Sequence, residues 1–185
     1  MFFGKGEWVL DRTSMKKIHY ITQGAVTAAL YVCLTLVFRP ISFGAVQIRV
    51  SEVLTVLPMF TPAAVPGLFL GCLLANMLGG AVIWDVIFGS LATLAGAALG
   101  FLLRKNRWLV SVPAIIANAV TVPFILRFAY GTEIPIPLMM LYVAAGESVS
   151  CYLLGQILIS ALLRRKISLS DDDKAIRNDT GSAEK

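Results

Sequence analysis

The chain has 185 residues, of which 57% are hydrophobic and 15% are charged, and its formal net charge is +5. About a quarter of the residues in a typical soluble domain are charged, so this composition argues against a soluble globular protein. The basic residues flank apolar segments, and no basic run is interleaved with aromatic residues, which argues against nucleic-acid binding.

Six apolar segments follow one another along the chain, and the longer ones approach the roughly 20 residues that cross ~30 Å of hydrocarbon as a helix. The second and third are short, and Pro58, Pro62 and Pro66 mark a break between them. These two segments could instead form one re-entrant hairpin. The predicted fold class is therefore an all-α membrane protein, a six-helix transmembrane bundle. Its segments are predicted at 18–38, 51–60, 66–78, 84–103, 108–127 and 138–163.

The two ends of the chain differ in character from its middle. Residues 1–15 are predicted to be an N-terminal extension, because they contain charged residues and no long apolar run. Residues 16–166 form the predicted membrane domain. Residues 167–185 are polar and acidic, and a segment with so few apolar residues is expected to be disordered.

The distribution of basic residues predicts the orientation. With six spans, one side of the membrane holds eight of them and the other side holds three, and the positive-inside rule places the richer side in the cytoplasm. Both termini are therefore expected to be cytoplasmic. The eight are Lys16, Lys17, Arg104, Lys105, Arg107, Arg164, Arg165 and Lys166, and the three are Arg39, Arg49 and Arg127.

Several polar side chains lie inside or at the ends of the apolar segments. An ionisable group at membrane depth costs roughly 2.5–3.5 kcal/mol on insertion scales, so it needs a reason to be there. In the predicted topology these groups gather in the outer half of the bundle, and we expect a water-accessible pocket that opens outward. The candidate binding residues are Glu147, Asp85, Glu52, Asn76, Asn118, Gln47, Arg49, Trp84 and Tyr142.

Each candidate also has a structural interpretation. Arg49 and Glu52 could pair at the membrane interface, and Asp85 could cap a helix N-terminus. The two asparagines could form interhelical hydrogen bonds. Trp84 and Tyr142 could belong to an aromatic belt or could provide a stacking surface for a flat ligand.

The sequence contains no recognisable catalytic motif. It has no His-Glu-x-x-His, no Gly-x-Ser-x-Gly and no phosphate-binding loop, so we expect neither an enzyme nor an ATP site. With one histidine and three separated cysteines, the usual metal sites are not expected either.

Three stretches, residues 43–58, 66–76 and 85–94, resemble the QueT family of predicted queuosine-precursor transporters. The resemblance covers about residues 16–166. It implies the substrate-binding S component of an energy-coupling factor (ECF) importer in the bacterial cell membrane. The implied partners are a transmembrane coupling subunit and two ATPase subunits, so the chain itself is expected to bind no cofactor. The coupling contact implied by the family falls on small residues of the first segment, Ala25 and Ala29.

The resemblance further implies a 7-deazaguanine ligand, such as the 7-cyano or 7-aminomethyl base or queuine. A buried carboxylate can accept the two adjacent N–H groups of a guanine-type edge, and Glu147 is the first candidate for this role. The alternatives are an S component for another micronutrient and a self-contained secondary transporter or channel.

Overall fold

The structure is a computed structural model that describes residues 12–42 and 48–165. Within these ranges every regular element is helical, and several helices contain 3₁₀ or π-helical segments. The elements are α1 (Arg12–Val37), α2 (Arg39–Ser42), the 3₁₀ helix η1 (Val50–Met59), α3 (Ala64–Gly79), the π-helical segment η2 (Asp85–Gly89), α4 (Ser90–Leu102), α5 (Val112–Phe128), α6 (Ile136–Glu147) and the π-helical segment η3 (Ser148–Leu154). The last helix continues past η3 to Arg165.

Three helices are long and apolar enough to cross a membrane, and three shorter apolar helices accompany them. Together they correspond to the six predicted segments, and the all-helical prediction is confirmed. The first helix begins at Arg12, inside the segment predicted as an extension. The three long helices are Ser14–Val37, Asp85–Leu102 and Ile136–Arg165, and the shorter ones are Val50–Met59, Ala64–Gly79 and Val112–Phe128.

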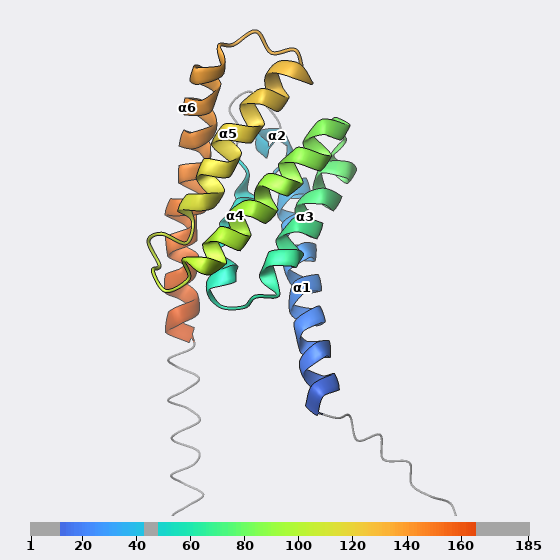
Figure 1. Ribbon diagram of the computed structural model, residues 1–185, viewed down its shortest axis with the longest axis vertical. Helices are drawn as coiled ribbons and strands as arrows, with labels where there is room; N and C mark the ends of the chain where they lie inside the picture. Colours follow the sequence, from blue (N-terminus) through green and yellow to red (C-terminus); the bar gives the residue numbers. More distant parts are fainter. Residues whose placement is uncertain (1–11, 43–47, 166–185) are drawn as a thin grey trace, which may run out of the picture.

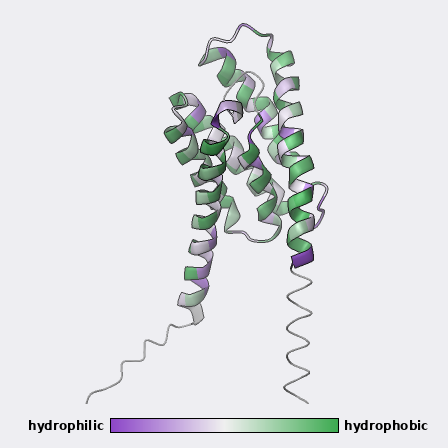
Figure 2. Ribbon diagram, turned by 180° about the vertical axis from the view of Figure 1, so that it is seen from behind, coloured by the Kyte–Doolittle hydropathy of each residue, from purple (hydrophilic) through white to green (hydrophobic). Residues whose placement is uncertain are grey.

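The helices pack in an ordered series (Figure 1). α1 packs on α3, α3 on α4, α4 on α5 and α5 on α6, while η1 lies inside the bundle against α1, α4 and η3. The first residues of α1 and the last residues of the long C-terminal helix lie at the same end of the molecule. Figure 2 shows hydrophobic residues along most of the helices.

The distribution of polarity between surface and interior is that of a membrane protein. Large apolar side chains point outward, for example Ile21, Leu141 and Ile157, which are 68%, 64% and 65% exposed. Hydrocarbon is as apolar as these side chains, so their exposure carries no penalty in a bilayer. The interior instead holds many polar side chains. They are Thr27, Thr35, Ser42, Arg49, Ser51, Glu52, Thr55, Asn76, Asp85, Ser90, Thr93, Ser111, Asn118, Glu147 and Ser150.

Glycines bring α1 and α3 into backbone contact. A Cβ atom added to Gly67 would lie 2.6 Å from the carbonyl oxygen of Gly24, and one added to Gly71 would lie 3.0 Å from the Cα atom of Ala28. Such approach is possible only without a side chain, and it is the usual way in which membrane helices associate. Both glycines therefore fix the position of the α1 face that carries Tyr31.

Candidate functional site

The acidic residues of the interior lie on, or directly before, the three irregular helical segments. Glu52 is on η1, Asp85 begins η2, and Glu147 is the last residue of α6, directly before η3. Departures from α-helical hydrogen bonding are frequent at functional sites, because they redirect side chains that a regular helix would aim elsewhere. All three carboxylates are at most 2% exposed.

Asp85 takes part in a buried ion pair with Arg49, the residue that precedes η1. The Arg49 Nη2 atom lies 3.4 Å from Asp85 Oδ2, and the two side chains are 3% and 2% exposed. The Asn76 amide donates to the Asp85 carbonyl oxygen at 3.2 Å. Burial raises the pKa of Tyr130, which lies in the loop after α5, so its phenol stays neutral and donates to Asp85 Oδ2 at 3.5 Å. The described bonds of the Asp85 carboxylate thus go to side chains on other elements and not to a helix terminus.

Glu52 is held from two sides within the bundle. The Tyr31 hydroxyl of α1 donates to Glu52 Oε1, and the Thr93 hydroxyl of α4 lies 3.4 Å from the same oxygen. The second oxygen, Oε2, is buried and has no hydrogen-bond partner among the described residues. Glu52 is 0% exposed, so this oxygen is a buried acceptor with no donor among the described residues.

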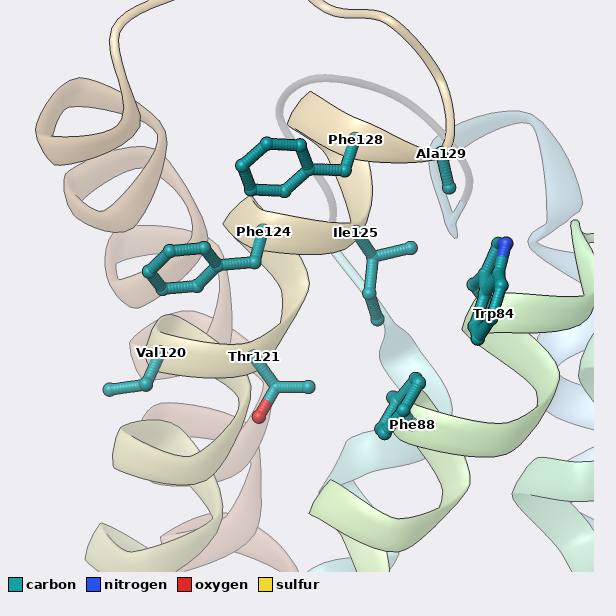
Figure 3. Close-up of a pocket in the computed structure, with 8 residues that line it drawn as sticks. All are labelled: Trp84, Phe88, Val120, Thr121, Phe124, Ile125, Phe128 and Ala129. Carbon is teal, nitrogen blue, oxygen red and sulfur yellow. The ribbon is translucent and has the colours of Figure 1, made fainter.

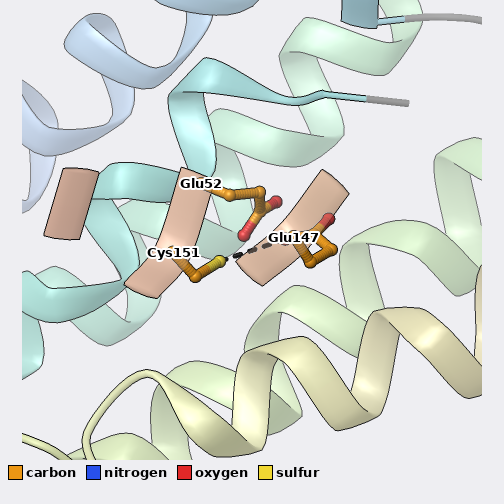
Figure 4. Close-up of side chains that lie close together, drawn as sticks. All are labelled: Glu52, Glu147 and Cys151. Carbon is orange, nitrogen blue, oxygen red and sulfur yellow. Dashed lines mark hydrogen bonds between the residues drawn. The ribbon is translucent and has the colours of Figure 1, made fainter. Parts of the chain in front are cut away.

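Glu147 lies across from Glu52 and has two neutral donors (Figure 4). The Asn118 amide donates to Oε1 at 3.1 Å, and the Cys151 thiol donates to Oε2 at 3.0 Å. One carboxylate oxygen of Glu52, one of Glu147 and the Cys151 sulfur lie within 4.8 Å of one another. Among the described residues these three side chains are a group that could bind a cation.

An apolar cavity of about 400 Å³ opens elsewhere on the bundle, between the segment formed by Trp84 and η2 and the helix α5 (Figure 3). Trp84 stacks on Phe88 on one side of it, with ring centres 5.9 Å apart, and α5 supplies the other side. No carboxylate lines this cavity, so Trp84 contacts a space separate from the buried acidic groups. The lining residues are Trp84, Phe88, Val120, Thr121, Phe124, Ile125, Phe128 and Ala129.

The other predicted residues are placed as follows. Gln47 lies outside the described residues, and Tyr142 is half-buried on α6. The two asparagines do form interhelical hydrogen bonds, and both bonds end on residues of the candidate site. Ala25 and Ala29 are exposed on the outer surface of α1, where none of the described helices covers them.

Three residues of the site were missed by the sequence analysis: Tyr31, Thr93 and Cys151. A signal for Tyr31 existed, because Thr27, Tyr31 and Thr35 are spaced four apart within an apolar segment and all three are buried. Cys151 lies four residues after Glu147, which places both on one helix face.

Comparisons with known proteins agree on one family. The family described as QueT transporter matches residues 21–164 of this chain. A curated relative from Lactococcus lactis subsp. cremoris (strain MG1363), named "Queuosine precursor transporter QueT", is 40% identical over 90 residues, which cover 47% of this chain and 52% of the relative. The chain thus spans about half the length of the curated relative it matches. No solved structure matches the chain.

Proposed function

Because the chain belongs to the QueT transporter family, we propose that it is the substrate-binding S component of an ECF importer and that it captures a queuosine precursor from outside the cell. Membership of a transporter family confirms that the protein is not an enzyme. The Lactococcus relative is named for the same class of cargo. The proposed ligand is a 7-deazaguanine, either the 7-cyano or 7-aminomethyl base or queuine.

The observation that carries this proposal is the burial of Glu52, Asp85 and Glu147 within one bundle, each with amide or hydroxyl groups beside it. Buried carboxylates are costly in a membrane protein and mark substrate or ion sites. A guanine-type edge offers two adjacent N–H donors, which one carboxylate accepts side by side. A ligand of this kind supplies a donor to the buried Glu52 Oε2 atom, which has none among the described residues.

The proposed topology places these groups in the outer half of a multi-pass protein of the bacterial cell membrane. The first residues of α1 and the last residues of the C-terminal helix lie at one end of the molecule, and we propose that this end is cytoplasmic, as the positive-inside rule expects from the basic residues near it. The candidate ligand groups then lie toward the opposite, outer side, as capture of an external nutrient requires.

The outer face of α1 supports the proposed coupling to partner subunits. Ala25 and Ala29 are exposed, whereas Thr27 and Tyr31, on the opposite face of the same helix, are buried against the rest of the chain. Small residues four apart allow another helix to approach closely. We propose that the coupling subunit docks there and that the ATPase subunits supply the energy, so this chain needs no cofactor of its own.

The test is direct binding by the purified protein in detergent. A thermal-shift series with 7-deazaguanines and unrelated vitamins is expected to show stabilisation by at least one deazaguanine and none by the vitamins. Stabilisation by a different vitamin alone would contradict the proposed cargo and leave an S component of another specificity. Gradient-driven uptake by this chain alone in liposomes, without ATPase subunits, would contradict the proposed coupling.

A further inference from the structure

Glu52 and Glu147 form a buried carboxylate pair whose described hydrogen-bond donors are all neutral. They are the hydroxyls of Tyr31 and Thr93, the amide of Asn118 and the thiol of Cys151. The described ion pair of Arg49 is with Asp85 on η2, and the Arg49 charge also acts on Glu52 and Glu147, so one guanidinium faces three buried carboxylates. In a medium of low dielectric constant the three carboxylates cannot all be charged unless a further cation or a proton compensates them.

The pair also keeps one acceptor open. Glu52 Oε2 has no hydrogen-bond partner among the described residues, although the side chain is 0% exposed. Figure 4 shows the Glu52 carboxylate directed toward Glu147 and Cys151. A buried acceptor without a donor is unfavourable by itself, and a ligand donor that enters between the two carboxylates removes this cost.

We infer that the carboxylate pair binds a protonated amine of the transported ligand, and that the protein therefore selects a deazaguanine with a cationic amine on its 7-substituent over one with a neutral group there. This inference rests on the proposed function and assigns the specificity of the same site. One oxygen of Glu52 and one of Glu147 lie within 4.8 Å of each other. This distance is shorter than the distance between the opposite ends of a bicyclic base, so both carboxylates act on one group of the ligand.

The geometry accommodates an ammonium group between the two carboxylates. Two acceptors around a tetrahedral nitrogen, each at ~2.8 Å, lie about 4.6 Å apart. Two oxygen ligands of a tetrahedral zinc ion lie only about 3.3 Å apart, because Zn–O distances are ~2.0–2.2 Å. The potential ligand atoms here lie within 4.8 Å of one another, a limit that accommodates the larger N–H···O geometry.

This assignment leaves the third buried carboxylate, Asp85, together with its ion-pair partner Arg49, for the base itself. Asp85 lies beside Asn76, one helical turn along α3 from Cys72, and Cys72 contacts the Thr93 hydroxyl next to Glu52. An amide and a carboxylate together match the carbonyl and N–H groups of a guanine-type edge. The two ends of one ligand would thus meet two distinct groups of side chains.

The experiment compares two ligands that differ only at this position, 7-aminomethyl-7-deazaguanine and 7-cyano-7-deazaguanine, by calorimetry with the purified full-length protein. The amine is expected to bind at least about tenfold more tightly, since a charge-assisted hydrogen bond is stronger than a neutral one. Glu52→Gln is expected to weaken amine binding more than about tenfold and nitrile binding less than about threefold. Glu133→Gln, which removes an exposed carboxylate in the loop before α6, is the matched control and is expected to change neither.

Equal affinity of the wild-type protein for the two ligands, or a preference for the nitrile, would overturn the inference, and this comparison does not depend on the folding of any variant. Equal weakening of both ligands by Glu52→Gln would also overturn it. Stabilisation by Zn²⁺ alone that Cys151→Ser abolishes would assign the cluster to a metal instead. Binding of neither deazaguanine is a different result, because it contradicts the proposed function and not merely its specificity.

Discussion

Removal of the Arg49 guanidinium is expected to destabilise the bundle by about 3 kcal/mol or more. The Arg49 Nη2 to Asp85 Oδ2 distance of 3.4 Å corresponds to an attraction on the order of 5 kcal/mol at an effective dielectric constant of ~20. Breaking a buried pair by removing one partner typically costs about 3–5 kcal/mol, because the other charge stays buried without compensation. The lower end is expected for Arg49→Met, since Tyr130 still donates to the Asp85 carboxylate.

The assay is the free energy of unfolding in detergent micelles, measured by denaturant titration for Arg49→Met, Asp85→Asn and the double variant. The double variant is expected to be at least about 1 kcal/mol more stable than Arg49→Met, because it leaves no unpaired charge. Arg127→Met is the matched control, since this arginine is exposed and its described hydrogen bond goes to the Thr132 carbonyl oxygen, and a loss below about 1 kcal/mol is expected. A loss for Arg49→Met no larger than for Arg127→Met, or strictly additive losses in the double variant, would refute the reasoning.

Three further substitutions test the packing, the outer surface of α1 and the support of Glu52. Gly67→Ala places a Cβ atom 2.6 Å from the Gly24 carbonyl oxygen, so α1 and α3 must separate. The cost of overpacking, ~1–3 kcal/mol, is expected to exceed the gain in helix propensity of ~1 kcal/mol. The variant is therefore expected to melt at a lower temperature than the wild-type protein. Ala29→Trp is expected to abolish transport in cells that contain the partner subunits and to leave ligand affinity within about twofold, because bulk prevents close helix docking. Tyr31→Phe removes a donor to Glu52 and is expected to lower the free energy of unfolding by about 1–3 kcal/mol.

Each of these substitutions has a control within the chain. Gly155→Ala meets the Val56 side chain at 2.8 Å and not backbone, so a smaller loss is expected than for Gly67→Ala. Leu30→Trp changes an exposed neighbour of Ala29 and should preserve transport, while Tyr20→Phe removes an exposed hydroxyl and should preserve stability. Co-purification of the coupling subunit with Ala29→Trp would place the docking surface elsewhere, and unchanged stability of Gly67→Ala or Tyr31→Phe would contradict the contacts described.

The helical segments could be predicted from the sequence because hydrocarbon imposes a simple requirement. A backbone that crosses it must satisfy its own hydrogen bonds, so long apolar runs become helices. The short second segment was also recognisable from Pro58 and its neighbours, and the structure forms the 3₁₀ helix η1 there. The π-helical segments η2 and η3 could not be predicted, since they arise from packing between helices and not from local propensity.

The candidate site was predictable only in part. The cost of charge at membrane depth singled out Glu52, Asp85 and Glu147, and burial of all three agrees with that argument. Their partners were not predictable, because spacing along one helix says nothing about which side chain faces it from another. Arg49 was thus weighed as a partner of Glu52, three residues away, whereas the structure pairs it with Asp85, 36 residues away.

The central claim is that buried carboxylates of this bundle bind the transported base, and calorimetry of Glu147→Gln tests it most directly. With the deazaguanine that stabilises the wild-type protein, the affinity of Glu147→Gln is expected to fall more than about tenfold while its melting temperature stays near that of Glu133→Gln. Wild-type affinity in a folded Glu147→Gln protein would contradict the claim.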